Sequence, residues 1–595
     1  MVCRGSAGRQ IDFGKGNFHV RVTGPGRRKP TAARLRSAAL LAIATLLAAP
    51  VQAQTASQIT PREFTPELQR LRGSVVFTGQ PGTQPPPGSE AIGITLSGVD
   101  LQNPLPQMAG ANRAYVGRLT RGRIPVSELF EATAALEAAY ADAGYVLARV
   151  VLPQQSLRDG GRLRVVVVNG FVETVDTSNV DPNIRRRIDQ LTASLVNRPG
   201  LTREELERQL LLAGDIPGTA LRSAIAAGEA QGATVIGVDP EYRLITGFVG
   251  FGNPSSTELG EFNLNTGIEI NSPFKLGETL YARLSGAPEK LFSEDPRSRV
   301  FALGAAVPVG ISGASVNVEA TFSDTMPDDA AAPTRSDFDR QSFRFFYPWK
   351  RGRILNVTGQ AMLDLQQEEQ ALIGGGTIFR DQLTILRAGA NMSLLLPDRS
   401  FTQAALVLSR GIDAFGARTA AEAAGGPPLS RAGADATFTK LVGSASHQRD
   451  LSERIALSVT GRFQTSFGRP LVNSEQFGLV GGSELSSFDN GALRGDSGAV
   501  VRAELSTRFD STISELPVSF SPYVFAGYGV AKLENPTALE QSITKAASYG
   551  IGLDVASSMN SSFRSGSMRI EYGIGTRDDA TPDEKRFSIS GTFRF

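Results

Sequence analysis

Charged side chains adjoin a glycine-rich stretch in the last third of the chain. Residues 475–496 are rich in Gly, Ser, Asn and Asp, as in a long loop. After it, apolar and polar residues alternate with period two, which predicts a strand with Arg502 and Glu504 on its polar face. Opposite charges so placed can form ion pairs, and carboxylates can perform acid–base chemistry. For these two residues, a pore-lining role and an interior ion pair both stay open.

Other catalytic chemistry is poorly represented. The chain has two histidines, His19 and His447, and one cysteine, Cys3. Cys3 and His19 lie in a segment that is predicted to be removed, which leaves one histidine. A multi-histidine metal site is therefore excluded, and a histidine-based triad is not expected. The sequence predicts no enzyme, no cofactor and no metal site, although carboxylate chemistry is not excluded.

The first 53 residues have the composition of a secretory signal. A basic stretch, RRKPTAARLR, precedes an apolar run over residues 37–49 and a small-residue site that ends at Ala53. That run is too short to span a bilayer, and no later stretch has the roughly 18 apolar residues of a membrane helix. We therefore expect residues 1–53 to be a signal or targeting segment.

Removal of this segment changes the net charge. It holds nine of the 61 basic residues and one of the 59 acidic residues, so 52 basic and 58 acidic residues remain, a net charge of −6. A nucleic-acid-binding protein is expected to show a basic surplus. The composition therefore indicates that nucleic acid is not a partner.

Three further regions follow the signal. Residues 54–90 are expected to hold a short helix, Thr65–Arg72, which is a candidate pore plug, and a Pro-rich linker. Two α+β units of about 75 residues follow, at 91–170 and 171–242. The expected elements of the first unit are a helix over 126–140 and strands over 145–152 and 162–169. Those of the second are strands over 171–177, 220–226 and 233–238, with helices over 183–195 and 202–212.

Residues 243–595 alternate between apolar and polar side chains, with turn residues between the runs. In the last run, Phe587, Ile589, Gly591, Phe593 and Phe595 share one face. A soluble β domain also alternates, but it seldom places so many Arg, Glu and Gln on one face. We count about 16 strands, with short and long connections in turn. The fold class is therefore mainly β, a 16-stranded antiparallel transmembrane β-barrel preceded by two α+β domains.

The two α+β units contain short recognisable motifs. The first unit has Ala143-Gly144-Tyr145, Pro153-Gln154, Gly161 and Gly170, and the second has the stretch LTREELERQLLLAGDIPG. With these motifs the units resemble the periplasmic POTRA domains of two-partner secretion transporters. The resemblance implies that residues 91–170 are POTRA 1, residues 171–242 are POTRA 2 and both lie in the periplasm.

The glycine-rich loop resembles the sixth loop of the same family. The family pattern has a central Val-Arg-Gly-aromatic motif, whose Arg pairs with a lumen Asp in a Phe-x-Asp motif. Here the centre reads Leu485-Ser486-Ser487-Phe488, and the second motif reads Phe525-Ala526-Gly527, so both partners are missing. Arg494 is a candidate to supply the positive charge in place of the missing family Arg. The retained family positions in and beside the loop include Glu475, Gln476, Phe477, Gly481, Gly482, Gly495, Asp496, Gly498 and Glu504.

The resemblance implies an outer-membrane translocator that secretes a partner exoprotein of the haemolysin or haemagglutinin type. Its partners would be this client, outer-membrane lipid and the barrel assembly machinery, for which the terminal aromatics Phe593 and Phe595 form the expected assembly signal. An outer-membrane insertion factor and a porin or receptor-type barrel remain alternatives. The Arg494-Gly495-Asp496 adhesion tripeptide is interpreted as a coincidence of the loop pattern.

Overall fold

The computed structural model describes residues 54–64, 85–328, 333–480, 484–559, 561–579 and 581–595. The predicted signal segment 1–53, the predicted helix 65–72 and the loop positions Gly481 and Gly482 lie outside the described residues. No helix in the described part of the chain is long and apolar enough to cross a membrane.

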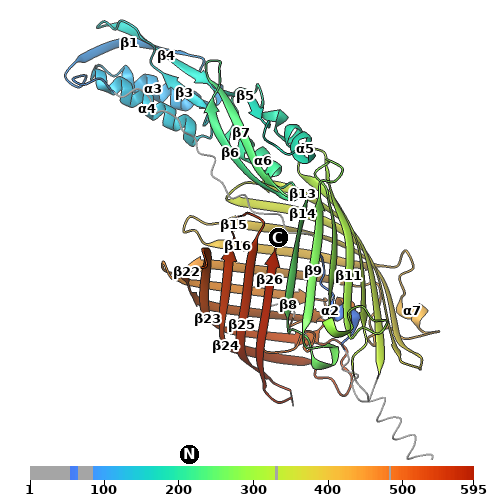
Figure 1. Cartoon of the computed structure of the whole chain (residues 1–595). Helices are drawn as coiled ribbons and strands as arrows, with labels where there is room; N and C mark the ends of the chain where they lie inside the picture. Colours follow the sequence, from blue (N-terminus) through green and yellow to red (C-terminus); the bar gives the residue numbers. More distant parts are fainter. Residues whose placement is uncertain (1–53, 65–84, 329–332, 481–483, 560, 580) are drawn as a thin grey trace, which may run out of the picture. The chain divides into compact units, whose positions relative to one another are not determined.

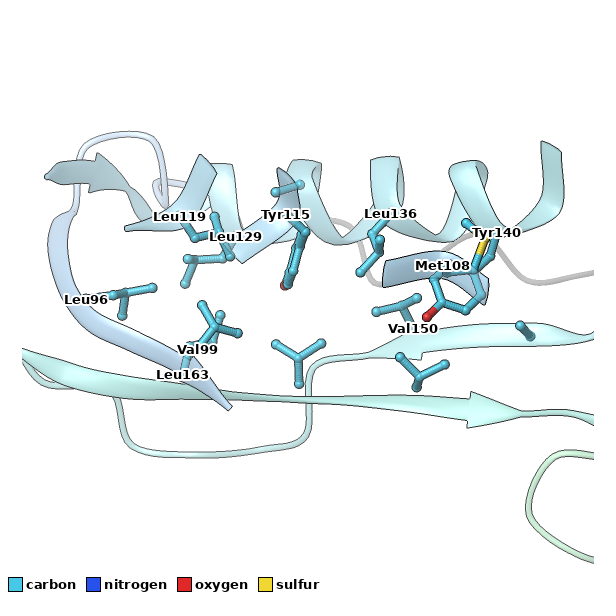
Figure 2. Packing of buried hydrophobic residues seen from close by; sticks show 14 of the residues in the cluster. Leu96, Val99, Met108, Tyr115, Leu119, Leu129, Leu136, Tyr140, Val150 and Leu163 are labelled. Carbon is cyan, nitrogen blue, oxygen red and sulfur yellow. The ribbon is translucent and has the colours of Figure 1, made fainter. Parts of the chain in front are cut away.

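The first α+β domain packs two helices against one face of a four-stranded sheet (Figure 2). Its strands lie in the order β2-β1-β4-β3, and Tyr140 on the second helix is fully buried between helix and sheet. The Tyr140 hydroxyl donates to Asn112 Oδ1 at 3.0 Å. The elements are β1 (Gly93–Gln102), α3 (Ala109–Leu119), β2 (Arg123–Pro125), α4 (Val126–Asp142), β3 (Ala148–Val151) and β4 (Gly161–Asn169).

The strand predicted over 145–152 begins three residues late. Gly144 follows α4 with φ +96°, and the Tyr145 N–H donates back to the Tyr140 carbonyl at 2.9 Å. The chain therefore stays in a helix-terminating turn before β3 begins.

The second α+β domain has a three-stranded sheet in the order β5-β7-β6. Thr202 and Glu205 form a capping box at the start of α6, which fixes where that helix begins. The predicted helix 183–195 ends early, and a 3-10 turn, Ala193–Leu195, completes it. The elements are β5 (Phe171–Asp176), α5 (Pro182–Thr192), α6 (Arg203–Gly214), β6 (Thr219–Ala227) and β7 (Ala233–Tyr242).

The strands after residue 244, apart from two short ones in a loop, form the predicted closed antiparallel barrel (Figure 1). β21 and β22 both pair with β23 and count as one interrupted strand, so the barrel has sixteen strands. The last strand closes on the first, from Ser590 opposite Gly252 to Arg594 opposite Phe248.

The barrel strands have the following bounds: β8 (Ile245–Gly252), β9 (Asn263–Asn271), β10 (Thr279–Gly286), β11 (Ser298–Val309), β12 (Ala314–Thr325), β13 (Thr334–Arg351), β14 (Leu355–Leu372), β15 (Thr377–Leu395), β16 (Phe401–Ile412), β17 (Thr439–Asp450), β18 (Ile455–Thr465), β21 (Ser497–Thr507), β22 (Phe509–Ile513), β23 (Leu516–Lys532), β24 (Ile543–Ser558), β25 (Ser565–Arg577) and β26 (Glu584–Arg594).

The two faces of the barrel wall differ in polarity, as the alternation predicts. On β13, Arg340 and Arg344 are buried, whereas Phe343 and Phe345 are exposed on the other face. On β26, Phe587 and Phe593 are likewise exposed. An apolar outer face and a polar lumen are the pattern of a transmembrane barrel.

Candidate functional site

The sixth loop, which connects β18 to β21, folds inward and fills part of the lumen. It spans 466–496, nine residues longer at its start than the predicted loop 475–496, because β18 ends at Thr465. Short strands β19 (Phe477–Gly478) and β20 (Arg494–Gly495) pair and make it a hairpin. Its tip is buried, with Leu485 and Phe488 at most 2% exposed.

The base of the hairpin is a joint built by the Gly-Asp-x-Gly motif. Asp496 accepts the Leu471 N–H at 2.8 Å with Oδ1 and the Glu534 N–H at 2.7 Å with Oδ2. A Cβ on Gly495 would lie 2.6 Å from the Lys532 carbonyl oxygen, and one on Gly498 would lie 2.8 Å from the Phe477 ring. Because Asp496 is fully buried, the Arg-Gly-Asp tripeptide is not displayed as an adhesion site.

The tip of the hairpin is held by a cation from the wall. Arg502 on β21 donates to Glu571 on β25 at 2.9 Å and to the Ser486 hydroxyl at 2.8 Å. The Ser486 hydroxyl donates in turn to Glu571 at 3.0 Å. Glu504 accepts from Arg502 at 2.7 Å. At the tip the loop therefore supplies a hydroxyl and the wall supplies the guanidinium.

The missing lumen Asp has a steric explanation. A Cβ on Gly527 would lie 2.4 Å from the Glu484 carbonyl oxygen and 3.2 Å from Leu485, so the loop tip occupies the space of a larger side chain. The Phe525 ring lies 3.8 Å from the Arg502 guanidinium carbon, a cation–π contact. Gly527 and Phe525 therefore both contact the parts that hold the loop tip in place.

A second ion pair joins the loop to the barrel wall. Arg462 on β18 donates to Glu484 in the loop at 2.6 Å, so the acid lies in the loop and the base in the wall. The structure does not place the candidate substitute Arg494 at the tip. It lies at the base of the hairpin, where its Nε donates to the Gly491 carbonyl at 3.1 Å.

The start of the loop is tied to strands that precede β18 in the barrel. Glu475 pairs with Arg387 on β15 at 2.8 Å and with Lys440 on β17 at 2.6 Å. Arg387 also pairs with Asp364 on β14 at 2.6 Å. Glu475 and Lys440 are each 2% exposed, so removal of Glu475 would leave the buried Lys440 without its ionic partner.

The lumen has a second occupant, residues 54–64, which contain the helical turn α2 (Ala56–Ile59). This segment contacts β12 to β14, and Ala56 is fully buried. Sequence reasoning placed the plug helix just beyond it, at 65–72. The segment reads QTASQITPREF, which has no apolar periodicity that could have revealed it.

The second α+β domain docks on the ends of the barrel strands through the motif that carried its resemblance. Asp215, just after α6, makes a two-pronged ion pair with Arg351 at 2.6 and 2.8 Å. Arg208 on α6 donates to the carbonyls of Ser312 at 3.0 Å and Pro348 at 3.2 Å. These residues of the second-domain motif therefore contact the barrel.

A second contact joins β7 to the turn after β24. Glu241 accepts from the Ser561 hydroxyl at 2.9 Å and the Ser562 N–H at 3.2 Å. Burial alone would raise the pKa of Glu241, but these hydrogen bonds and nearby Arg243 lower it below the ordinary value. The contact is therefore present above the ordinary carboxyl pKa and weakens as the pH falls through the lowered value.

A cavity of about 930 Å³ lies between this domain and the strand ends. Its lining includes the apolar side chains Leu212, Ile216 and Phe346, together with Arg351. Glu63 of the lumen segment also lines it, so the cavity connects the docking contact with the lumen.

A sixteen-stranded barrel with an apolar outer face and a polar lumen is a transmembrane barrel of the outer-membrane type, here preceded by two α+β domains. The family model described as haemolysin secretion/activation protein ShlB/FhaC/HecB matches residues 232–555, and the ShlB-type POTRA domain model matches residues 95–170. The chain belongs to this family. Comparison with individually curated proteins gave no match.

Solved structures show the same fold. CdiB from Escherichia coli is 20% identical, with a TM-score of 0.66, and the match covers 95% of this chain and 98% of that chain. CdiB from Acinetobacter baumannii is 15% identical, with a TM-score of 0.58 and the same coverage. The resemblance stated from the sequence is thus confirmed. The protein is a two-partner secretion transporter of the outer membrane, its POTRA domains face the periplasm, and the insertion-factor and porin alternatives are not favoured.

Proposed function

We propose that this transporter captures a haemolysin- or haemagglutinin-type exoprotein at its POTRA domains and passes it, unfolded, through the lumen. The observation that carries the proposal is the state of the lumen, which the hairpin tip and residues 54–64 both occupy. A passing chain must displace at least one of them. The cavity between the second α+β domain and the strand ends is a site where the exoprotein can bind before it enters the lumen.

Strand β6 is the favoured docking edge for an extended client. It lies at one edge of the β5-β7-β6 sheet, whereas the opposite edge, β5, is partly covered by a bridge from Val172 to Val196. An open edge can take up an extended chain as an added strand through main-chain hydrogen bonds. This mode suits a client that arrives unfolded.

Deletion of residues 91–242 tests the docking role. The 243–595 barrel should still assemble, because its strands and the terminal Phe593 and Phe595 are intact, and it should migrate as a heat-modifiable band. Secretion of the partner should be lost. If export continues at the normal level, the docking role is wrong and a porin or receptor function gains support.

A finer test uses two neighbouring residues of β6. In an antiparallel pair the N–H groups of Ser223 and Ala224 point to opposite sides of the strand, so one of them faces away from β7. Proline at whichever of the two residues has its N–H facing away from β7 removes a hydrogen-bond donor from the open edge of the sheet. It leaves the hydrogen bonds between β6 and β7 intact. We expect it to weaken client binding about tenfold. Alanine at 223 and glycine at 224 are the matched controls, and barrel assembly should not change.

A further inference from the structure

Side chains of three adjacent strands bind the main chain of residues 54–64. From β12, Ser323 donates to the Ala56 carbonyl at 3.2 Å, and Glu319 accepts the Phe64 N–H at 3.2 Å. From β13, Ser336 accepts the Ala56 N–H at 3.3 Å, Arg340 donates to the Pro61 carbonyl at 3.0 Å and Arg344 donates to the Arg62 carbonyl at 3.3 Å. From β14, Glu368 accepts the Ser57 N–H at 3.2 Å.

These contacts do not depend on the sequence of the bound segment. Every residue except proline offers one N–H donor and one C=O acceptor. Carboxylates such as Glu319 and Glu368 serve the donors, and the guanidinium groups of Arg340 and Arg344 serve the acceptors. All four side chains are buried, so their hydrogen bonds are made away from bulk water.

Glu368 points most directly to a removable partner. Glu368 is 1% exposed, its Oε1 accepts the Ser57 N–H, and the side chains of Thr55 and Ser57 also interact with its carboxyl group. Glu319, by contrast, is paired within the wall with Arg340, Arg344 and Tyr281. A buried carboxylate is costly without donors. When residues 54–64 leave, Glu368 requires donors from whatever chain replaces them.

The direction of the segment fits an export route. Ala56 lies at Ser336 and Arg62 lies at Arg344, so the segment follows β13 from the end near the long loops toward the POTRA end. Glu63 then reaches the cavity beside the second α+β domain. The segment thus connects the two mouths that a secreted chain must pass.

We propose that the inner wall of β12, β13 and β14 is a main-chain binding track for the exported polypeptide, and that residues 54–64 are its resident occupant. The ligand class is an unfolded polypeptide of any sequence that carries main-chain N–H groups. The proposal rests on the proposed function, because it assigns the wall residues that the client contacts. Such a track explains how the lumen can bind a polypeptide without specific contacts to its side chains.

Release of the occupant is the first step of the test. Ser57→Pro removes the N–H that Glu368 accepts, and proline is tolerated in the first turn of a helix such as α2. The control Ser57→Ala keeps that N–H. In planar bilayers we expect the full-length Ser57→Pro protein to open about ten times more often than Ser57→Ala. Equal opening frequencies would contradict main-chain anchoring.

The second step compares two probes on the Ser57→Pro protein. A glycine–serine peptide has main-chain N–H groups, and a polysarcosine of equal length has none. The peptide should block the open channel with a residence time about tenfold longer than polysarcosine. Equal residence times overturn the track, and this comparison needs no variant of the wall.

The third step assigns the track to Glu368. Glu368→Leu removes the hydrogen-bond acceptor and should shorten the peptide residence time about tenfold toward that of polysarcosine. Glu369→Leu is the matched control, because Glu369 is the next residue on β14 and pairs with Arg380 on the other face. Equal residence times in the two variants would overturn the role of Glu368.

The probes contain no secreted partner, so the two proposals fail separately. If the peptide is held longer than polysarcosine but deletion of residues 91–242 leaves export unchanged, the track stands and POTRA docking fails. If that deletion abolishes export but both probes leave equally fast, docking stands and the track is wrong.

Discussion

The two occupants of the lumen are held in different ways. The sixth-loop hairpin is fixed by charged pairs such as Glu484 with Arg462, besides main-chain contacts such as that of the Gly478 carbonyl with Arg462. Residues 54–64 are fixed by main-chain hydrogen bonds, as when Glu368 accepts the Ser57 N–H, and by side chains such as Gln54, which donates to the Asn490 carbonyl. The charged pairs of the hairpin depend on particular residues at particular places, whereas another chain could make the main-chain contacts of residues 54–64.

The same difference appears in the cost of separation. Withdrawal of the hairpin separates Glu484 from Arg462. Both charged side chains are largely buried, and each then lacks its ionic partner. Withdrawal of residues 54–64 breaks neutral-donor or neutral-acceptor hydrogen bonds, which a passing main chain can replace. We expect the hairpin to be the stable occupant and residues 54–64 to be the exchangeable one.

The largest expected effect is the loss of Arg502. Arg502→Met leaves Glu571 buried without its cation and frees the Ser486 hydroxyl, which should lower the free energy of unfolding by about 3–5 kcal/mol. The midpoint of urea unfolding, followed by heat-modifiable migration, measures this loss. Arg508→Met is the control, because the Arg508–Asp510 pair is two-thirds exposed and should contribute less than about 1 kcal/mol. Equal losses would show that the tip is not locked by its buried charge.

A smaller effect is expected from reversal of the loop ion pair. Glu484→Arg and Arg462→Glu should each destabilise the protein by about 2 kcal/mol, because each places like charges together in a partly buried site. The double exchange should recover about half of the summed loss, since it restores an ion pair but loses the Arg462 contact with the Gly478 carbonyl. If the losses in the free energy of unfolding of the two single variants simply add in the double variant, the Arg462–Glu484 pair does not hold the hairpin.

Packing at the tip gives the next effect. A Cβ on Gly575 would lie 2.7 Å from the Phe488 ring, so Gly575→Ala should push the hairpin tip and cost about 1–2 kcal/mol. Gly566→Ala lies on the same strand, and its Cβ would have no neighbour within 4 Å. The difference in unfolding midpoint between the two variants isolates the contact, and no difference would mean that Phe488 repacks freely.

The sequence predicted what depends on local alternation. Arg502 and Glu504 fall on the inner face because side chains of a strand alternate, and the terminal aromatics fall on the outer face for the same reason. Pairing across the folded hairpin could not be predicted in this way. The partners Arg462 and Glu484 are 22 residues apart in sequence and meet only because the loop turns into the lumen.

The lumen segment escaped prediction for a different reason. A hydrophobic period reveals an element that buries its side chains, but residues 54–64 are bound by their main-chain N–H and C=O groups. Helix α3 was also missed, since AGANRAYVGRL carries two glycines and a weak apolar pattern. In both cases the side-chain pattern does not predict the element, because the main chain or only a few apolar residues make the contacts.

The smallest expected effect comes from the side chains of the lumen segment. The double variant Gln58→Ala with Pro61→Ala keeps the Pro61 carbonyl that Arg340 binds and the Ser57 N–H that Glu368 accepts. The opening frequency in planar bilayers should therefore stay within about twofold of the unmodified protein, because no main-chain hydrogen bond is lost. The opening frequency of Ser57→Pro, which lacks a single main-chain donor, should be several-fold higher than that of the double variant. If the double variant opens as often as Ser57→Pro, side chains hold the segment after all, and the two occupants of the lumen do not differ in kind.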